Sequence, residues 1–152
     1  MFRGVSSILI DGKGRIAIPT RYRAELEESC DRQLILTIDR DPCLLLYPLG
    51  EWETIEHKLM KLPSLNPQAK RLQRLLIGHA TECQMDTQGR VLVAEPLRRY
   101  ADLKKSVALI GQGNKFEIWD EDNWAASRRV WLETYRVDDL SELAPELSSL
   151  SL

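Results

Sequence analysis

One short motif occurs twice in this chain, and it constrains the fold more than any other feature. Residues 11–15 are DGKGR and residues 86–90 are DTQGR, so both match the pattern D-x-x-G-R. An apolar segment precedes and follows each copy, which is the pattern of two strands joined by a tight turn. The motif aspartates, Asp11 and Asp86, define the offset between the two copies. The motif therefore indicates a tandem duplication of a small β-rich unit.

The segments around the two motifs extend the duplication. Strands are predicted directly before and after each turn, from short apolar runs bounded by turn residues. Two further β-type runs with a short, hairpin-like connection follow in each copy. The predicted strands are residues 5–10, 16–19, 33–39 and 43–48 in the first copy, and residues 79–85, 91–96, 106–111 and 115–120 in the second.

A proline and a short helical stretch follow each turn, with the sequences PTRYRAEL in the first copy and PLRRYADL in the second. Aligning Pro19 with Pro96 also pairs Arg21 with Arg98, at an offset two positions longer than the offset between the motif aspartates. The second copy is therefore expected to carry two extra residues before its proline. These are Ala94 and Glu95.

Each copy closes with an amphipathic helix, predicted over residues 51–59 and 122–130, in which Trp52 aligns with Trp124. Apolar side chains at helical spacing are more often part of a core than of a ligand site. A linker helix precedes the second copy. Its expected N-cap is Asn66, because asparagine caps helices well and the proline that follows fits the first helical position.

The residue types of the motif suggest separate roles. An aspartate in a tight turn accepts hydrogen bonds from the amides that follow it, and a glycine at the fourth position supplies a positive φ. The arginine begins the outgoing strand, where it either folds back onto the aspartate or projects from the sheet. The spacing leaves both alternatives open. The predicted turn residues are Asp11, Gly14, Arg15, Asp86, Gly89 and Arg90.

Charge is distributed unevenly, although the formal net charge is only −2. Residues 1–23 contain five basic residues and one acid, a net charge of +4, whereas residues 130–152 contain one basic residue and five acids, a net charge of −4. A run of charge is often only a solvated face, but binding to a polyanion depends on the local field rather than on the net charge. The candidate DNA contacts are therefore Arg3, Lys13, Arg15, Arg21 and Arg23.

Membrane and metal functions find no support. No apolar run approaches the roughly 18 residues of a membrane span, and no secretory signal opens the chain, so we expect a cytoplasmic protein. Cys30, Cys43 and Cys83 form no C-x-x-C pair and are expected to be reduced and buried. His79 lies four residues before Cys83, as two ligands on a helix would, but no second pair completes a metal site. Neither a metal nor a cofactor is predicted.

Catalysis is not predicted either. Duplicated D-x-G motifs build the aspartate pair of acid proteases, but DGKG and DTQG both miss that pattern by one residue. Such a pair needs one aspartate with a raised pKa, whereas an arginine four residues away favours the ionised form. The two histidines, His57 and His79, lie in no catalytic motif, and no glycine-rich loop has the spacing that binds phosphate.

Several segments, in order along nearly the whole chain, resemble the MraZ family. They are MFRG, DGKGR followed by IPTRYR, CLLLYPLGEWETIE, RLLIGHA and DTQGR. The resemblance implies a bacterial transcription regulator with two D-x-x-x-R repeats and an AbrB-like swapped-hairpin, or double-psi, β-barrel. It also implies ring-shaped homo-oligomers that associate with the nucleoid. Such rings would bind short direct repeats in the promoter of the division and cell-wall gene cluster, and repress the protein's own operon.

Together these observations predict a mixed α/β fold, mainly β, in which two repeats form one intertwined domain with helices packed around it. The predicted parts are a first repeat at 1–60, a linker helix at 61–78, a second repeat at 79–137 and an acidic C-terminal tail at 138–152.

The predicted function is sequence-specific regulation of transcription, without enzymatic activity, a small-molecule substrate or a membrane partner. Lys13 and Arg15 would reach the major groove of double-stranded promoter DNA, where arginine can pair with guanine through two hydrogen bonds. The other three N-terminal arginines would contact phosphate. Residues 76–100 carry no net charge, so the first copy is expected to read DNA and the second to close a turn. The alternative is a structural or protein-interaction oligomer in which the basic segment is incidental.

Overall fold

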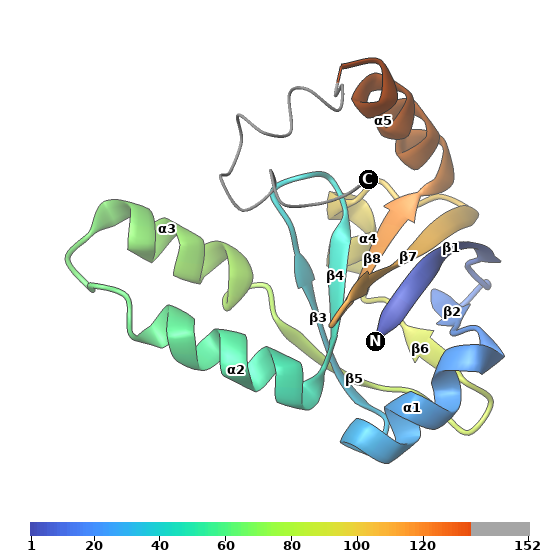
Figure 1. The fold of residues 1–152 in the computed structure, drawn as a ribbon, viewed down its shortest axis with the longest axis horizontal. Coiled ribbons are helices and arrows are strands. Elements are labelled where there is room, and N and C mark those ends of the chain that lie inside the picture. The colour runs from blue at the N-terminus through green and yellow to red at the C-terminus, as the bar shows by residue number, and fades with distance from the viewer. Residues whose placement is uncertain (135–152) are drawn as a thin grey trace, which may run out of the picture. The chain divides into compact units, whose positions relative to one another are not determined.

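The computed structural model describes residues 1–134, which contain eight strands and five helices (Figure 1). Residues up to Glu121 form one compact unit, and a second begins at Asp122. None of the helices in the described range is long and apolar enough to cross a membrane. In chain order the elements are β1 (Phe2–Leu9), β2 (Arg15–Ala17), α1 (Thr20–Cys30), β3 (Gln33–Ile38), β4 (Leu44–Pro48), α2 (Leu49–Met60), α3 (Pro67–Leu76), β5 (Thr81–Gln84), β6 (Arg90–Leu92), α4 (Glu95–Tyr100), β7 (Ser106–Gly113), β8 (Phe116–Asp120) and α5 (Glu121–Thr134).

The strands form two antiparallel sheets. One has six strands in the order β1-β7-β8-β4-β3-β5, and the other consists of β2 and β6 alone. The predicted class, mixed α/β built around β-structure, is confirmed. The barrel is open rather than closed, because β1 and β5 lie at opposite edges of the large sheet and do not pair with each other. Each of these edge strands leads into a D-x-x-G-R turn that carries the chain out of the large sheet and into the small one.

The first strands of the two copies are exchanged. β1 of the first copy pairs with β7 of the second along its whole length, and β5 of the second copy pairs with β3 of the first. β4 and β8, one from each copy, pair at the centre of the sheet. The counterparts in the two copies are β1 and β5, β3 and β7, and β4 and β8. When each strand is exchanged for its counterpart, the sheet has the same strand order read from the opposite edge. The bounds predicted for the repeats and the linker stay predictions, and the acidic tail lies outside the described residues.

The small sheet sets the register between the copies. Its central pair is Ile16 opposite Val91, and both side chains are fully buried. Neighbouring residues of a strand face opposite sides, so the flanking residues point outward. The flanking pairs are Arg15 with Leu92 and Ala17 with Arg90. The inner face of this two-stranded ribbon therefore joins the core, and the outer face carries both motif arginines.

After the small sheet, equivalent residues of the two copies are still separated by the same number of positions as the motif aspartates. The two extra residues predicted in the second copy are therefore wrong. The N-caps of α1 and α4 are Pro19 and Ala94, which are separated by the same offset as Asp11 and Asp86. Pro96 instead lies in the first turn of α4, a position that tolerates proline because its amide has no partner within the helix. The two prolines are therefore not equivalent, and Arg98 is the counterpart of Arg23 rather than of Arg21.

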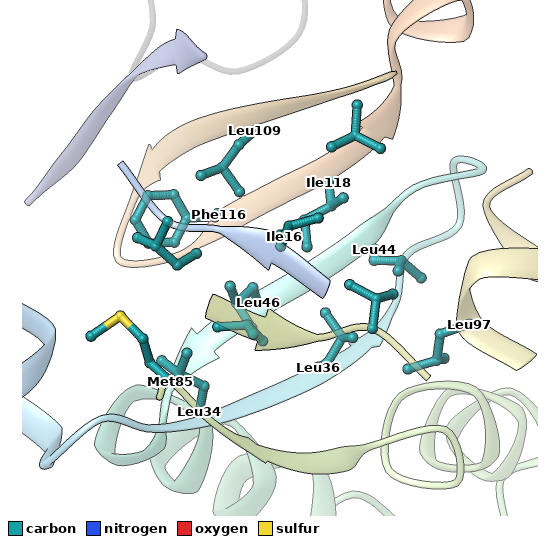
Figure 2. Packing of buried hydrophobic residues seen from close by; sticks show 14 of the residues in the cluster. Ile16, Leu34, Leu36, Leu44, Leu46, Met85, Leu97, Leu109, Phe116 and Ile118 are labelled. Atoms are coloured by element: carbon teal, nitrogen blue, oxygen red, sulfur yellow. The ribbon is translucent and has the colours of Figure 1, made fainter. Parts of the chain in front are cut away.

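Strands β3 and β4 of the large sheet are covered on both faces. On one face, side chains of β3 and β4 pack with the small sheet and with α1 and α4. Figure 2 shows part of this cluster, with Ile16 of β2 and Leu97 of α4 among side chains of β3 and β4. Alternate residues of the same strands form a second cluster with Trp52 of α2. Burial on both faces explains why the two strands are almost uninterrupted apolar runs. The second cluster consists of Ile35, Leu45, Tyr47 and Trp52, with Leu49, Ile55, Leu76, Ile77 and Ala80 packed against it.

The helices form largely where the spacing predicted them. Asn66 caps α3, since its Oδ1 accepts hydrogen bonds from the amides of Gln68 and Ala69 at 2.9 and 3.2 Å. Trp52 and Leu59 are buried on one face of α2, the amphipathic helix predicted at the end of the first copy. Within α5, the rings of the two tryptophans at 124 and 131 meet edge to face, with 5.9 Å between centroids. The three cysteines are free thiols, of which only Cys43 is fully buried.

Candidate nucleic-acid interface

The first D-x-x-G-R turn is closed by the carboxylate of Asp11. Its Oδ1 accepts hydrogen bonds from the amides of Lys13 and Arg15, both at 2.9 Å, and its Oδ2 accepts one from Nε of Arg15 at 2.8 Å. The amide of Gly14 donates to the Asp11 carbonyl at 3.0 Å, and Gly14 has a φ of 84°, which glycine adopts without steric cost. Three donors therefore converge on one carboxylate.

The second turn repeats these contacts. Oδ1 of Asp86 accepts hydrogen bonds from the amides of Gln88 and Arg90 at 2.9 and 2.8 Å, and Oδ2 accepts one from Nε of Arg90 at 2.8 Å. Gly89 has a φ of 78°. The sequence left open whether the motif arginine folds back or projects outward. In both turns its Nε folds back onto the aspartate, while the strand places the residue on the outer face of the ribbon.

The hydrogen bonds within the turns keep both aspartates ionised. The amide of Arg15 is the main cause that lowers the pKa of Asp11 from its ordinary value of 3.8 to about 2. The amide of Arg90 has the same effect and lowers the pKa of Asp86. Near neutral pH each carboxylate is therefore charged and orients its arginine through Nε.

This arrangement leaves the outer nitrogens of both arginines available. Across residues 1–134, no hydrogen bond or ion pair within the protein involves the Nη atoms of Arg15 or Arg90, and the two side chains are 26% and 33% exposed. A guanidinium with two free Nη groups can pair with the edge of guanine, and a two-stranded ribbon has a size that the major groove of DNA admits. The outer face of the β2–β6 ribbon is therefore a candidate DNA-reading surface.

The tips of the two turns differ in charge. Lys13 occupies in the first turn the position that Gln88 occupies in the second. Lys13 is exposed, and within the described part of the chain its ammonium group has no ion-pair partner. The first turn therefore presents one more positive charge than the second, although the two backbones have the same hydrogen bonds.

The remaining N-terminal arginines lie in two other places. Arg21 lies beside β1, where its Nη2 donates to Oγ of Ser6 and to the hydroxyl of Tyr22, both at 2.9 Å. The Tyr22 hydroxyl in turn donates to the carbonyl of Arg3. Arg3 and Arg21 are thus neighbours, but five residues of extended chain, about 17 Å, separate Ser6 from the first turn.

Arg23 lies apart from both groups. Its Nε donates to the carbonyl of Ile18 at 2.8 Å, and its side chain lies against Gly89 of the second turn. The five candidate cations are therefore distributed over three places rather than one continuous patch. Sequence reasoning missed Arg98, which lies in the same way against Gly14. The signal that could have identified it was its offset from Arg23, which equals the offset between the two motif aspartates.

The possible metal ligands of the described residues are His79 with Cys83, which the sequence singled out, and one cluster of three side chains. His79 and Cys83 do not share a helix, because α3 ends at Leu76 and Cys83 lies in β5. Asp39, Cys43 and Glu117 each place one possible ligand atom within 4.8 Å of the others. Burial raises the pKa of the Cys43 thiol, and the two carboxylates raise it further. The thiol donates a hydrogen bond to Asp39 at 3.7 Å, so we treat this cluster as part of the packing.

Two strand-exchanged copies, each with an arginine-bearing turn at the end of a small ribbon, define the class of duplicated swapped-hairpin β proteins. Comparison with known proteins identifies the family within this class. Residues 1–75 and 76–130 both match the family model described as "MraZ protein, putative antitoxin-like". The chain belongs to the MraZ family.

Relatives with the same name match over the full length of the chain. The chain is 62% identical over 151 residues to "Transcriptional regulator MraZ" of Methylococcus capsulatus, which covers 99% of both proteins. It is 55% identical to the protein of that name from Thioalkalivibrio sulfidiphilus, with all of both chains covered. A third, from Pectobacterium carotovorum subsp. carotovorum, is 59% identical over 97% of this chain and 99% of the relative.

Proposed function

We propose that this protein is a sequence-specific DNA-binding regulator of transcription, and that the first D-x-x-G-R turn reads the DNA. The observation that carries the proposal is the outer face of the β2–β6 ribbon, where Arg15 is fixed through Nε and keeps its Nη donors free. The names of the relatives, which are transcriptional regulators, support the same function. The proposal includes no catalytic step and no small-molecule substrate.

In the proposed complex, the first turn enters the major groove of double-stranded DNA. Arg15 donates two hydrogen bonds to a guanine, and Lys13 contacts the base edges or the adjacent phosphate at the tip of the turn. Arg3 of β1 and Arg21 of α1, which lies beside β1, hold the phosphate backbone. Arg23 contributes a phosphate contact through its Nη groups, because its Nε is already bound to the Ile18 carbonyl.

The second turn is proposed to close the fold rather than to read bases. A polyanion favours the turn with more positive charge, and the tip of the second turn carries Gln88 in place of Lys13. In this proposal Arg90 chiefly pairs with Asp86.

The proposed target is a set of short direct repeats upstream of the division and cell-wall gene cluster, where the protein represses its own operon. We propose a ring-shaped homo-oligomer, located in the cytoplasm at the nucleoid. One N-terminal segment can neutralise only a few phosphates, so several linked copies are needed to hold repeated sites tightly. A monomer mass by light scattering at micromolar concentration would contradict this part of the proposal.

The test is binding to the DNA upstream of the protein's own gene at two salt concentrations. Arg15→Ala is expected to cost about 1–3 kcal/mol and to relax the base preference at one position. Arg90→Ala, the matched variant of the second turn, is expected to change affinity far less. If Arg15 contacts phosphate instead, the loss is similar for all sequences and the salt slope falls by about one unit.

Two results would count against the proposal. Equal losses from Arg15→Ala and Arg90→Ala, with fold and oligomer mass intact, would place both turns on the DNA. Binding by the unaltered protein that lacks both sequence preference and salt dependence would favour the alternative, a structural or protein-interaction oligomer.

A further inference from the structure

Two arginines outside the motifs are bound in the same way in the two copies. Arg23 and Arg98 occupy equivalent positions of the two copies, and both are half-buried. Nε of Arg23 donates to the carbonyl of Ile18 at 2.8 Å, and Nη1 of Arg98 donates to the carbonyl of Val93. In each case the acceptor lies five residues before the arginine, directly after the ribbon strand of the same copy.

Each of these arginines also lies across the turn of the other copy. A Cβ atom built on Gly14 would overlap Nη1 of Arg98, and one built on Gly89 would overlap Nε of Arg23. Each guanidinium group therefore occupies the space that a side chain at the glycine would fill. The glycines are buried as a result.

The same carbonyl-bearing residues join the two copies through their amides. The amide of Ile18 donates to the carbonyl of Gly89 at 2.8 Å, and the amide of Val93 donates to the carbonyl of Gly14 at 2.9 Å. Ile18 therefore holds Arg23 with its carbonyl and the second turn with its amide. An arginine, a ribbon end and the opposite turn form one closed set of contacts, and this set occurs twice.

We infer that Arg23 and Arg98 are positioning residues that act across the copies: Arg98 holds the turn from Asp11 to Arg15, and Arg23 holds the turn from Asp86 to Arg90. A charge-assisted hydrogen bond to a carbonyl is stronger than a neutral one, and the planar guanidinium covers the glycine backbone at the same time. The consequence for DNA rests on the proposed function: a residue of the second copy sets the geometry of the turn that reads DNA.

Hydrogen exchange of the full-length, DNA-free protein tests this inference. The amides of Lys13, Gly14 and Arg15 report on the first turn, because each is bound to Asp11, and those of residues 88–90 report on the second. In Arg98→Gln, exchange in the first turn is expected to become about tenfold faster than in the second, which corresponds to about 1.4 kcal/mol. Arg23→Gln is expected to give the reverse pattern.

The readout is the ratio of exchange rates between the two turns of one molecule. A loss of stability of the whole fold speeds both turns equally and leaves this ratio unchanged. An unchanged ratio in both variants, or faster exchange in the turn of the arginine's own copy, would therefore overturn the inference. Arg99→Gln is the matched control, since Arg99 neighbours Arg98 in α4 but is 78% exposed and pairs with Glu95.

A second measurement separates this inference from the proposed function. Arg98→Gln is expected to lower the affinity for the upstream DNA severalfold, although Arg98 is not a proposed DNA contact. Failure of the unaltered protein to bind that DNA would contradict the proposed function and leave the crossed exchange pattern standing. Normal binding by Arg98→Gln, together with a loosened first turn, would show that the turn does not read DNA.

Discussion

At the scale of single residues, the two motif aspartates concentrate several donors on one exposed carboxylate. Asp11 and Asp86 each accept two amides and one Nε within five residues of chain. An exposed pair of Asp and Arg contributes little, about 0–1 kcal/mol. The amide hydrogen bonds therefore contribute more to the stability of the turn than the ion pair does. Protonation of the carboxylate weakens them, because it removes the charged acceptor.

The lowered pKa of Asp11 predicts a defined acid sensitivity. A carboxylate with a depressed folded-state pKa stabilises the fold above its unfolded value and loses that contribution as pH falls through the folded value. For Asp11 this interval extends from pH 3.8 down to about 2. Asp11→Asn is expected to be less stable near neutral pH and to lose less stability across this interval. Urea unfolding at several pH values measures both curves, and parallel curves would contradict the prediction.

At the scale of elements, the glycine at the fourth motif position decides whether the turn can form. Gly14 has a positive φ and lies under Arg98, whereas a Cβ atom built on Gly12 in the same turn would meet no other atom within 4 Å. The two glycines of DGKGR therefore have different importance despite their closeness in sequence.

Replacing these glycines separates the two situations. Gly14→Ala is expected to destabilise the fold by about 1–3 kcal/mol, from backbone strain alone, with the displacement of Arg98 in addition. Gly12→Ala, the matched control, is expected to stay within about 0.5 kcal/mol. Chemical denaturation of both variants provides the comparison. Equal stability of the two variants would mean that the turn adopts another conformation in solution.

Local patterns were enough to predict the elements. The runs that became β3 and β4 are apolar because both of their faces are buried, so composition alone located them within a residue or two. The predicted alignment of the two copies after the turn is wrong because Pro19 and Pro96 are not equivalent residues. Proline is compatible with both the N-cap and the first helical turn, so it marks a helix start without fixing its residue.

The candidate site was predictable only within each turn. The contacts of Asp11 reach at most four residues along the chain, so residue types and spacing suffice to suggest them. The contact between Arg98 and Gly14 joins residues far apart in sequence, and it depends on the pairing of β2 with β6. Composition and periodicity carry no information about which strands pair, so neither the strand exchange nor the crossed arginines followed from them.

At the scale of the whole described chain, most strand pairs join one copy to the other. The pairs β1–β7, β2–β6, β3–β5 and β4–β8 connect the copies, and only β3–β4 and β7–β8 lie within one copy. Each of the two sheets is therefore built from strands of both copies. The covalent link between the copies, which includes α3, is therefore only one of many connections.

Cleavage of that link is expected to leave the two halves associated. Leu65, 92% exposed in the loop between α2 and α3, is a suitable position for an engineered protease site. After cleavage the fragments are expected to co-elute on size exclusion and to separate only in denaturant, with an unfolding midpoint that now depends on concentration. Fragments that separate in native buffer would contradict the importance of the exchanged strands.

The fusion of two matched copies into one chain also affects how the protein can vary over generations. In a symmetric dimer of identical halves, one codon change alters both turns together, so a substitution that improves one turn also changes the other. In a fused chain each turn has its own codons, and a substitution changes one turn alone. Lys13 and Gln88 occupy matched positions with different charge, while aspartate, glycine and arginine are the same in both turns. Selection can therefore act on the two surfaces one at a time.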